Sequence, residues 1–350
     1  MSPRVVIDSE GDIILQLHQE QPSEAAADGE TVGEKLETRE LIVSSKVLSL
    51  ASPVFKVMIS GKFKEGVELA EKTASSETYD LPLPEDDAEA TIILCRVLHF
   101  SIKDVPEKPT TVCLEKLAYL CDKYQCINAM KYCGGLWLRN WLLVCDNEDP
   151  SIDDLCRLLI FAYVVDLPYE FLGISWKLFL THKGPFLGPF TQAVMLVDHP
   201  LLHHNVAREM DTKRFQCCKS FHRGIMAPAN WNWQTLTKNC YRAAKAVGSY
   251  FNSLQIAGIL PYDLGFTEHR FCDLIRKASH LPYISVSQIK TESRRFYYNK
   301  LRACRKREQK SLPGAGASVP LALEERWQWE WSKIRLPNAG VSVPLALEER

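Results

Sequence analysis

Features that assign a function directly are scarce in this sequence of 350 residues. No apolar run reaches the roughly 18 residues that a membrane-spanning helix needs. No Gly-x-Ser-x-Gly, phosphate-binding glycine-rich loop or His-Glu-x-x-His occurs. The first residues, MSPRVVIDSEGDIILQL, carry acids inside their apolar part, unlike a secretory signal peptide. We therefore expect a non-enzymatic protein of the cytoplasm or the nucleus, with no cofactor and no membrane partner.

Metal-ligand and catalytic patterns are also weak. Two carboxylate pairs, Asp86-Asp87 and Asp153-Asp154, each lie where a helix is expected to begin, so capping and the helix dipole explain them. One group of residues has the donor types that zinc prefers, but its spacing matches no closed structural site. It consists of His199, His203, His204, Cys217, Cys218 and His222. We predict no metal site and no catalytic residue.

The charge is close to balanced overall but unevenly distributed. The net charge is −1, yet residues 1–150 hold 15 Lys/Arg and 26 Asp/Glu, whereas the remainder holds 27 and 17. The two parts therefore differ in sign, at −11 and +10, which predicts two separate units. The basic part could meet an acidic partner, or the two parts could attract each other.

Twelve cysteines in a chain that is not exported are expected to be reduced thiols. Half of them lie in apolar helical contexts, where cysteine behaves as a small buried hydrophobic residue. These are Cys95, Cys113, Cys121, Cys126, Cys133 and Cys156.

The first 43 residues predict a strand pair around an insertion. Residues 12–17 and 40–43 are short apolar runs, and the second is the expected hairpin partner of the first. Between them, residues 18–38 are acidic and nearly free of large apolar side chains. Such a segment buries too little surface to order itself, so we expect a flexible insertion.

The stretch over residues 39–66 organises the N-terminal part. After the strand, Ser44 or Ser45 can cap a helix, and Pro53 allows only the start of a second helix, expected at 54–59. Residues 62–78 are charged and are predicted to form a loop. A third strand is expected at 79–83, and the Pro84-Glu-Asp-Asp87 run predicts a helix start for 88–100.

The remaining pattern is mainly helical. Gly134-Gly135 could kink or interrupt one of the helices. A polar break at 146–150 marks the expected domain boundary. Helices are predicted at 112–124, 128–144, 152–165 with Ser151 as its cap, 169–180, 231–259, 273–279 and 287–310.

The tail contains an internal repeat. Residues 312–326 (LPGAGASVPLALEER) recur as residues 336–350 (LPNAGVSVPLALEER), with 13 of 15 positions matching. Two copies are too few for a solenoid, and the richness in Pro, Gly and Ala predicts a weakly ordered tail at 311–350. The near-identity points to a recent duplication or to an error in the gene model.

The ordered series of these elements resembles a known domain. Two strands, SSKVL, SPVF, GKFKEG, a third strand, PEDDA and LAYLCDKY resemble the BTB/POZ domain, in the version common in filamentous fungi. The resemblance implies an α+β domain at 9–145, after an arm at 1–8, with a small sheet flanked by helices. A mainly α-helical region at 150–310 would follow. It also implies a non-enzymatic adaptor that binds protein partners.

The resemblance further implies a homodimer, because family dimers usually bury the first strand and the two helices of the central stretch. The residues carried over are apolar, and the alternative is that they fill only the core of the domain itself. They are Val47, Leu48, Leu50, Val54, Phe55 and Met58. The insertion at 19–38 is longer than the usual hairpin turn and could interfere with a dimer formed through the first strand.

A second contact is implied by the same resemblance. Family members that recruit cullin-type ubiquitin ligases carry a hydrophobic-x-Glu element after the second helix, and Phe63 and Glu65 match it. An apolar anchor beside a charge can bind a donor on the partner. The sequence departs from many relatives at Ser45, where they have His, but a serine can still cap the helix.

One basic segment supports a competing function. It is interleaved with aromatic residues and could be a nuclear-import signal or contact nucleic-acid phosphates, or it could be a solvated helix face. Its basic residues include Arg294, Arg295, Lys300, Arg302, Arg305, Lys306 and Arg307. The alternative to an adaptor is therefore a nuclear regulator, although we do not expect nucleic acid to be the main partner.

Overall fold

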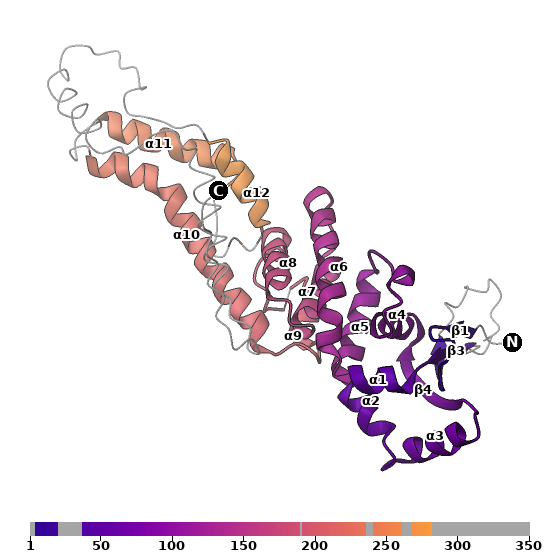
Figure 1. The fold of residues 1–350 in the computed structure, drawn as a ribbon. Helices are drawn as coiled ribbons and strands as arrows, with labels where there is room; N and C mark the ends of the chain where they lie inside the picture. Colours follow the sequence, from indigo (N-terminus) through magenta and orange to yellow (C-terminus); the bar gives the residue numbers. More distant parts are fainter. Residues whose placement is uncertain are drawn as a thin grey trace, which may run out of the picture. The chain divides into compact units, whose positions relative to one another are not determined.

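The computed structural model describes residues 4–19, 37–189, 191–235, 241–260, 266 and 268–281. The chain is α+β, with one small mixed sheet and a majority of helical residues (Figure 1). It divides into two compact units. Unit 1 holds the described residues up to Ser175 together with Asp198–His203, and unit 2 holds Trp176–Val197 and the described residues from His204 on.

Unit 1 contains a four-stranded sheet in the order β1-β3-β2-β4. The two central strands pair antiparallel, with Ile14 opposite Ile42, so the predicted hairpin pairing is confirmed. The two outer strands run parallel to their neighbours. The strands are β1 (Arg4–Val6), β2 (Ile13–Gln19), β3 (Glu37–Val43) and β4 (Tyr79–Asp87).

Strand β4 is longer than the sequence indicated. Its side chains alternate between buried and exposed over Tyr79–Leu83, and the strand continues to Asp87. The helix predicted at 88–100 is confirmed at Ala88–Leu98, but residues 84–86 belong to the strand and not to the first turn of that helix. Asp87 caps the following helix by accepting a hydrogen bond from the backbone N–H of Ala90 at 2.9 Å.

Helices make up the rest of unit 1 (Figure 1). Ser151 caps α7 as predicted, by accepting a hydrogen bond from the backbone N–H of Asp154. Gly134 and Gly135 do not interrupt α6. The helices are α1 (Ser45–Ala51), α2 (Pro53–Met58), α3 (Lys64–Ala74), α4 (Ala88–Leu98), the short 3₁₀-helix η1 (Ile102–Asp104), α5 (Thr111–Tyr124), α6 (Ile127–Asn147), α7 (Ile152–Val164) and the first half of α8 (Pro168–Thr181).

Two local predictions in the central stretch are wrong. The side chains of Ser44 and Ser45 do not cap α1. Instead, the carboxylate of Asp12 accepts hydrogen bonds from the backbone N–H of Ser45 at 2.7 Å and from its hydroxyl at 2.6 Å. The charged segment expected to be a loop contains α3, which is tied to β4 by the hydrogen bond from the hydroxyl of Tyr79 to Glu68.

The core of unit 1 is built around α4. This helix contacts strands β2, β3 and β4 and helices α1, α5 and α6. The expected burial of six cysteines is confirmed, and these thiols lie in the interior as small apolar side chains. They are Cys95, Cys113, Cys121, Cys126, Cys133 and Cys156.

Unit 2 is helical in its described part. Buried aromatic rings form its centre: Phe271 lies 4.5 Å from Phe179 and 5.4 Å from Phe221 between ring centroids. The single helix predicted over 231–259 is wrong, because the region holds the end of α10 and all of α11. Its helices are the second half of α8, α9 (Met195–Asp198, whose last residue belongs to unit 1), α10 (Asn205–Thr235), α11 (Tyr241–Ile256) and α12 (Phe271–Ser279).

The loop after α8 is fixed by hydrogen bonds from α10 and from its own backbone. Asp211 accepts from the backbone N–H groups of Phe186 and Leu187 at 2.5 and 2.9 Å. His182 is fully buried, and its Nδ1 lies 3.2 Å from the carbonyl oxygen of Gly184. The backbone N–H of Gln192 donates to the other ring nitrogen of this histidine, Nε2, at 3.3 Å.

Several predicted features lie outside the described residues. These are residues 1–3 of the arm predicted at 1–8, residues 20–36 of the insertion predicted at 18–38, the basic segment with the predicted helix at 287–310, and the repeated tail at 311–350. Within the described ranges, no helix combines the length and the apolar character that crossing a bilayer requires.

Candidate protein-interaction surface

The central stretch folds as two short helices held against α5. Ser52 ends α1, caps α2 by accepting from the backbone N–H of Phe55 at 3.1 Å, and donates to the carbonyl oxygen of Tyr124 at 2.5 Å. The rings of Phe55 and Tyr124 stack at a centroid distance of 4.2 Å and an angle of 11°. One serine and one aromatic pair therefore fix the orientation of α2.

This orientation divides the six predicted dimer residues. Leu48 and Phe55 are only 0% and 1% exposed, so in unit 1 they are core residues. Val47, Val54 and Met58 are half-buried at the margin. Leu50 is 81% exposed and points away from the core. All six residues are apolar and were predicted to act together. Only the tertiary packing shows that Leu48 and Phe55 belong to the core and that Leu50 is exposed.

The structure adds an apolar residue that the sequence analysis missed. Val57, on α2, is 54% exposed. It follows Phe55 by two positions, so on a helix it must face away from the buried ring. Together with Leu50 it gives the α1–α2 pair two large apolar side chains in solvent.

Phe63 and Glu65 lie at the start of α3. Phe63 is the N-cap residue and is 49% exposed, and Glu65 is half-buried in the first turn. Gly66 follows, and a Cβ there would lie 1.9 Å from the carbonyl oxygen of Ser60. Only glycine permits this close approach, which sets the angle at which the chain enters α3. One turn on, Val67 is 45% exposed beside Phe63.

Tyr124, which stacks on Phe55, also belongs to a buried polar cluster around Asp86, which is 3% exposed. Its carboxylate accepts hydrogen bonds from the hydroxyl of Tyr124 and, at 2.7 Å, from the ammonium of Lys123. Burial, followed by the hydrogen bond to Asp86, raises the pKa of the Tyr124 hydroxyl above its usual value. This carboxylate therefore holds α5 to the end of β4, which is a structural role and not the capping role predicted for the Asp86-Asp87 pair.

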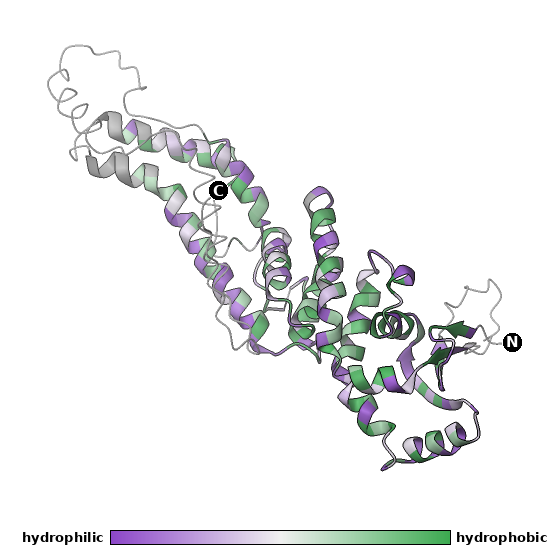
Figure 2. Ribbon diagram, in the orientation of Figure 1, coloured by the Kyte–Doolittle hydropathy of each residue, from purple (hydrophilic) through white to green (hydrophobic). Residues whose placement is uncertain are grey.

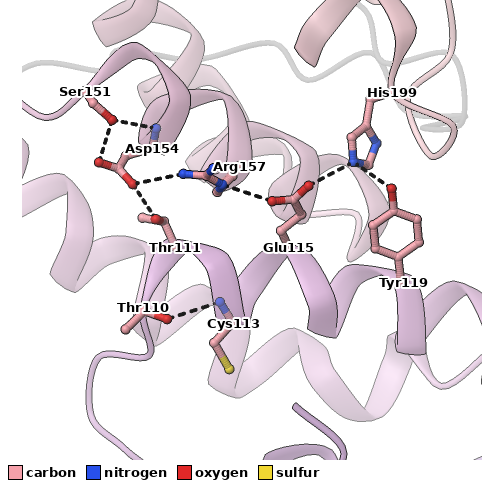
Figure 3. Close-up of polar contacts among 9 residues, drawn as sticks. All are labelled: Thr110, Thr111, Cys113, Glu115, Tyr119, Ser151, Asp154, Arg157 and His199. Atoms are coloured by element: carbon pink, nitrogen blue, oxygen red, sulfur yellow. Dashed lines mark hydrogen bonds and ion pairs between the residues drawn. The ribbon is translucent and has the colours of Figure 1, made fainter. Parts of the chain in front are cut away.

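A second polar network joins α5, α7 and the segment Asp198–His203 (Figure 3). Arg157 is at its centre, with its Nε 3.0 Å from Glu115 and its Nη1 3.5 Å from Asp154. At one end Glu115 lies 3.4 Å from Nε2 of His199, which is also 3.1 Å from the hydroxyl of Tyr119. Because Nδ1 of His199 accepts from the backbone N–H of Leu201 at 3.3 Å, the proton of a neutral ring lies on Nε2.

Asp154 lies at the other end of the network, and its partners there determine its pKa. Burial alone would raise its pKa, but hydrogen bonds from Ser151 and Thr111 and the charge of Arg157 outweigh this effect and lower the pKa. Its oxygens are occupied by these partners, with the hydroxyl of Ser151 at 2.6 Å. The carboxylate is held ionised as part of the packing between α5 and α7.

Replacing Arg157 by leucine is expected to lower the free energy of unfolding by about 1–3 kcal/mol, because Glu115 and Asp154 would keep their partial burial without the intervening cation. Urea denaturation of the full chain measures the change. Lys131→Met is the matched control, since Lys131 and Asp166 form a more exposed pair that contributes about 0–1 kcal/mol. Equal losses for the two variants would contradict the central role of Arg157.

The residues weighed as zinc ligands are dispersed. His199 belongs to the network above, His203 and His204 precede α10, and Cys217 and Cys218 are buried on that helix. Over the ranges that the structure describes, no group of three or more His, Cys, Asp or Glu side chains is placed to hold a metal ion.

Comparison of this chain with protein-family models, curated proteins and solved structures finds no match in any of the three.

Proposed function

We propose that this chain is a non-enzymatic adaptor or scaffold whose unit 1 is a BTB/POZ-like interaction domain. The observation that carries the proposal is the exposure of large apolar side chains on α1, α2 and the start of α3. They are Leu50, Val57, Phe63 and Val67. The adaptor works in the cytoplasm or nucleus, where buried thiols such as Cys121 and Cys126 stay reduced.

The packing supports a binding role for these side chains. The helices that carry them are anchored by Leu48 and Phe55, which already supply the buried contacts that the fold needs. Leu50 and Val57 contribute little to that core, so their exposure gives no stability to the isolated chain. Large apolar side chains that stay exposed on anchored helices are a common feature of protein-interaction sites.

The proposal includes self-association through α1 and α2. In the full chain, Leu50→Asp combined with Val57→Asp is expected to convert a dimer to a monomer at tens of micromolar, because each carboxylate would be buried unpaired in an apolar interface. Sedimentation velocity measures the mass. Phe100→Asp is the matched control, because Phe100 is 86% exposed on the loop after α4. A monomeric parent protein, or a dimer in the double variant, would refute self-association through these helices.

The cullin-type ligase contact is tested separately. Affinity purification of the tagged full chain from cells, followed by mass spectrometry, is expected to recover a cullin with the parent and at least tenfold less with Phe63→Ala/Glu65→Ala. A tenfold loss corresponds to about 1.4 kcal/mol, which is modest for an apolar anchor and a charge. Circular dichroism of both proteins shows whether α3 is retained. Equal recovery of a cullin, or none with the parent, would reject the contact.

A further inference from the structure

Helix α10 carries a linear cationic face with an aromatic residue at its centre. Arg208, Lys219 and Arg223 are exposed, and Phe215 is 55% exposed. At 100° per residue, these four side chains and Thr212 fall within an arc of roughly 80°. From the first to the last of them the helix rises about 22 Å. We name Arg208, Phe215, Lys219 and Arg223 the α10 stripe.

The orientation of the α10 stripe is fixed by the opposite side of the helix. Val206, Met210, Cys217 and Phe221 are each at most 3% exposed and face the interior of unit 2. Near the middle of the helix, the guanidinium of Arg214 donates to the carbonyl oxygens of Phe179 and His182. The helix therefore cannot turn its cations inward without breaking the core. Figure 2 shows the mixture of hydrophilic and hydrophobic residues along the described part of α10.

The cations of the α10 stripe are not neutralised within the described part of the chain. No carboxylate there pairs with Arg208, Lys219 or Arg223, although other cations of the same chain do have such partners. The stripe therefore favours an anionic partner from outside the chain.

We propose that the α10 stripe binds single-stranded nucleic acid. Proteins that bind single strands combine cations that contact the phosphates with an aromatic side chain on which a base stacks. Phe215 lies between cations on both sides along the helix, with Arg208 before it and Lys219 and Arg223 after it. An acidic peptide would use the cations but not the ring. An anionic membrane would require an apolar face of several residues, but the stripe has only one apolar side chain, that of Phe215.

The test is binding of the full chain to a fluorescent 20-nucleotide oligo-dT over a salt series, followed by anisotropy. The variant Arg208→Gln/Lys219→Gln/Arg223→Gln is expected to lower the slope of log K against log salt by about 2, because each cation contributes about 0.7 on a single strand. Its affinity at about 0.1 M salt should fall by at least tenfold. Residues 294–310 are unchanged in this variant, so the change in slope reports α10 alone.

Two further variants make the result specific. Phe215→Ala is expected to weaken binding about tenfold without changing the salt slope, because a stacking contact releases no counterions. Lys46→Gln/Lys62→Gln/Lys103→Gln removes the same number of exposed charges from unit 1 and should leave both affinity and slope unchanged. An unchanged slope in the α10 triple variant, or an equal loss in the unit 1 variant, would overturn the proposal.

The competing ligands are separate arms of the same experiment. Polyglutamate, a duplex of the same length, and vesicles of mixed zwitterionic and anionic lipid are expected to compete weakly with the labelled strand. Tighter binding of any of these would assign the stripe to that ligand and overturn the proposal. The inference is independent of the adaptor function, because Leu50→Asp/Val57→Asp is expected to leave oligonucleotide binding intact.

Discussion

Replacing Phe55 by alanine is expected to lower the free energy of unfolding of the protein by about 3–5 kcal/mol. The side chain is 1% exposed, and its ring stacks on Tyr124 at 4.2 Å. Its removal would leave a cavity between α2 and α5 and a tyrosine with one bare face. Denaturation of the full chain in urea, followed by circular dichroism and fluorescence, measures the loss. A change below about 1 kcal/mol would contradict the assignment of Phe55 to the core.

Leu50→Ala is the matched control for that measurement. Leu50 is apolar, belongs to the same helix pair and carries the same sequence-based expectation, but it is 81% exposed. Its truncation should change the free energy of unfolding by no more than about 0.5 kcal/mol. The two variants together separate residues that hold α1 and α2 in place from residues that are free to contact a partner.

Acidification is expected to destabilise the protein through His182 as the pH falls from about 6.5 to about 4. Burial, and to a lesser extent the charge of Arg214, lowers the pKa of this histidine from 6.5 to about 4 in the folded state. Over that window the unfolded chain takes up a proton that the folded chain refuses. The free energy of unfolding therefore falls by about 1.4 kcal/mol per pH unit, or about 3 kcal/mol in total.

The histidine contribution can be isolated by a difference measurement. Burial raises the pKa of the neighbouring Asp211, so this carboxyl acts in the opposite direction and favours the folded state as the pH falls. Both the parent and His182→Gln contain Asp211. The contribution of Asp211 to the pH dependence therefore cancels in the difference between their stability profiles from pH 4 to 8. The parent is expected to lose about 3 kcal/mol more than the variant. Parallel profiles would contradict the prediction.

Strong local patterns were sufficient to predict much of unit 1. The Pro84-Glu-Asp-Asp87 run predicted a helix at 88–100, the Ser151 cap marked the start of α7, and the paired runs around residues 14 and 42 predicted the antiparallel strands. In each case the residues that decide the structure are neighbours in the sequence or repeat at a helix or strand period.

The missed helices have weak patterns for identifiable reasons. Helix α3 has only Val67 and Leu69 as large apolar residues, and its attachment depends on a distant tyrosine, Tyr79. The buried side of helix α10 is formed partly by Met210, Cys217 and the stem of Arg214. These residue types give only a weak hydrophobic pattern in the sequence. Both helices depend on tertiary partners that a local window does not contain.

The candidate surface could be located from the sequence but not oriented. Leu48, Leu50 and Phe55 are equally apolar in a residue-by-residue reading, and only the cap at Ser52 with its bond to Tyr124, 72 positions away, decides which of them faces inward. The α10 stripe was missed for a related reason. Its cations are scattered among apolar residues in the sequence and become one face only when the helix period is known.

Unit 1 is discontinuous in the sequence, because the segment Asp198–His203 returns to it after the chain has entered unit 2. The contact between His199 and Glu115 joins this segment to α5. A gene fragment that stops at residue 175 would retain α5 and α7 but deprive Glu115 and Tyr119 of their imidazole partner. A protease cut between residues 176 and 197 would leave the returning segment joined to unit 1 only by noncovalent contacts. Excision of this unit as an independent module thus requires a circularly permuted gene, or a short linker that connects residue 175 directly to residue 198.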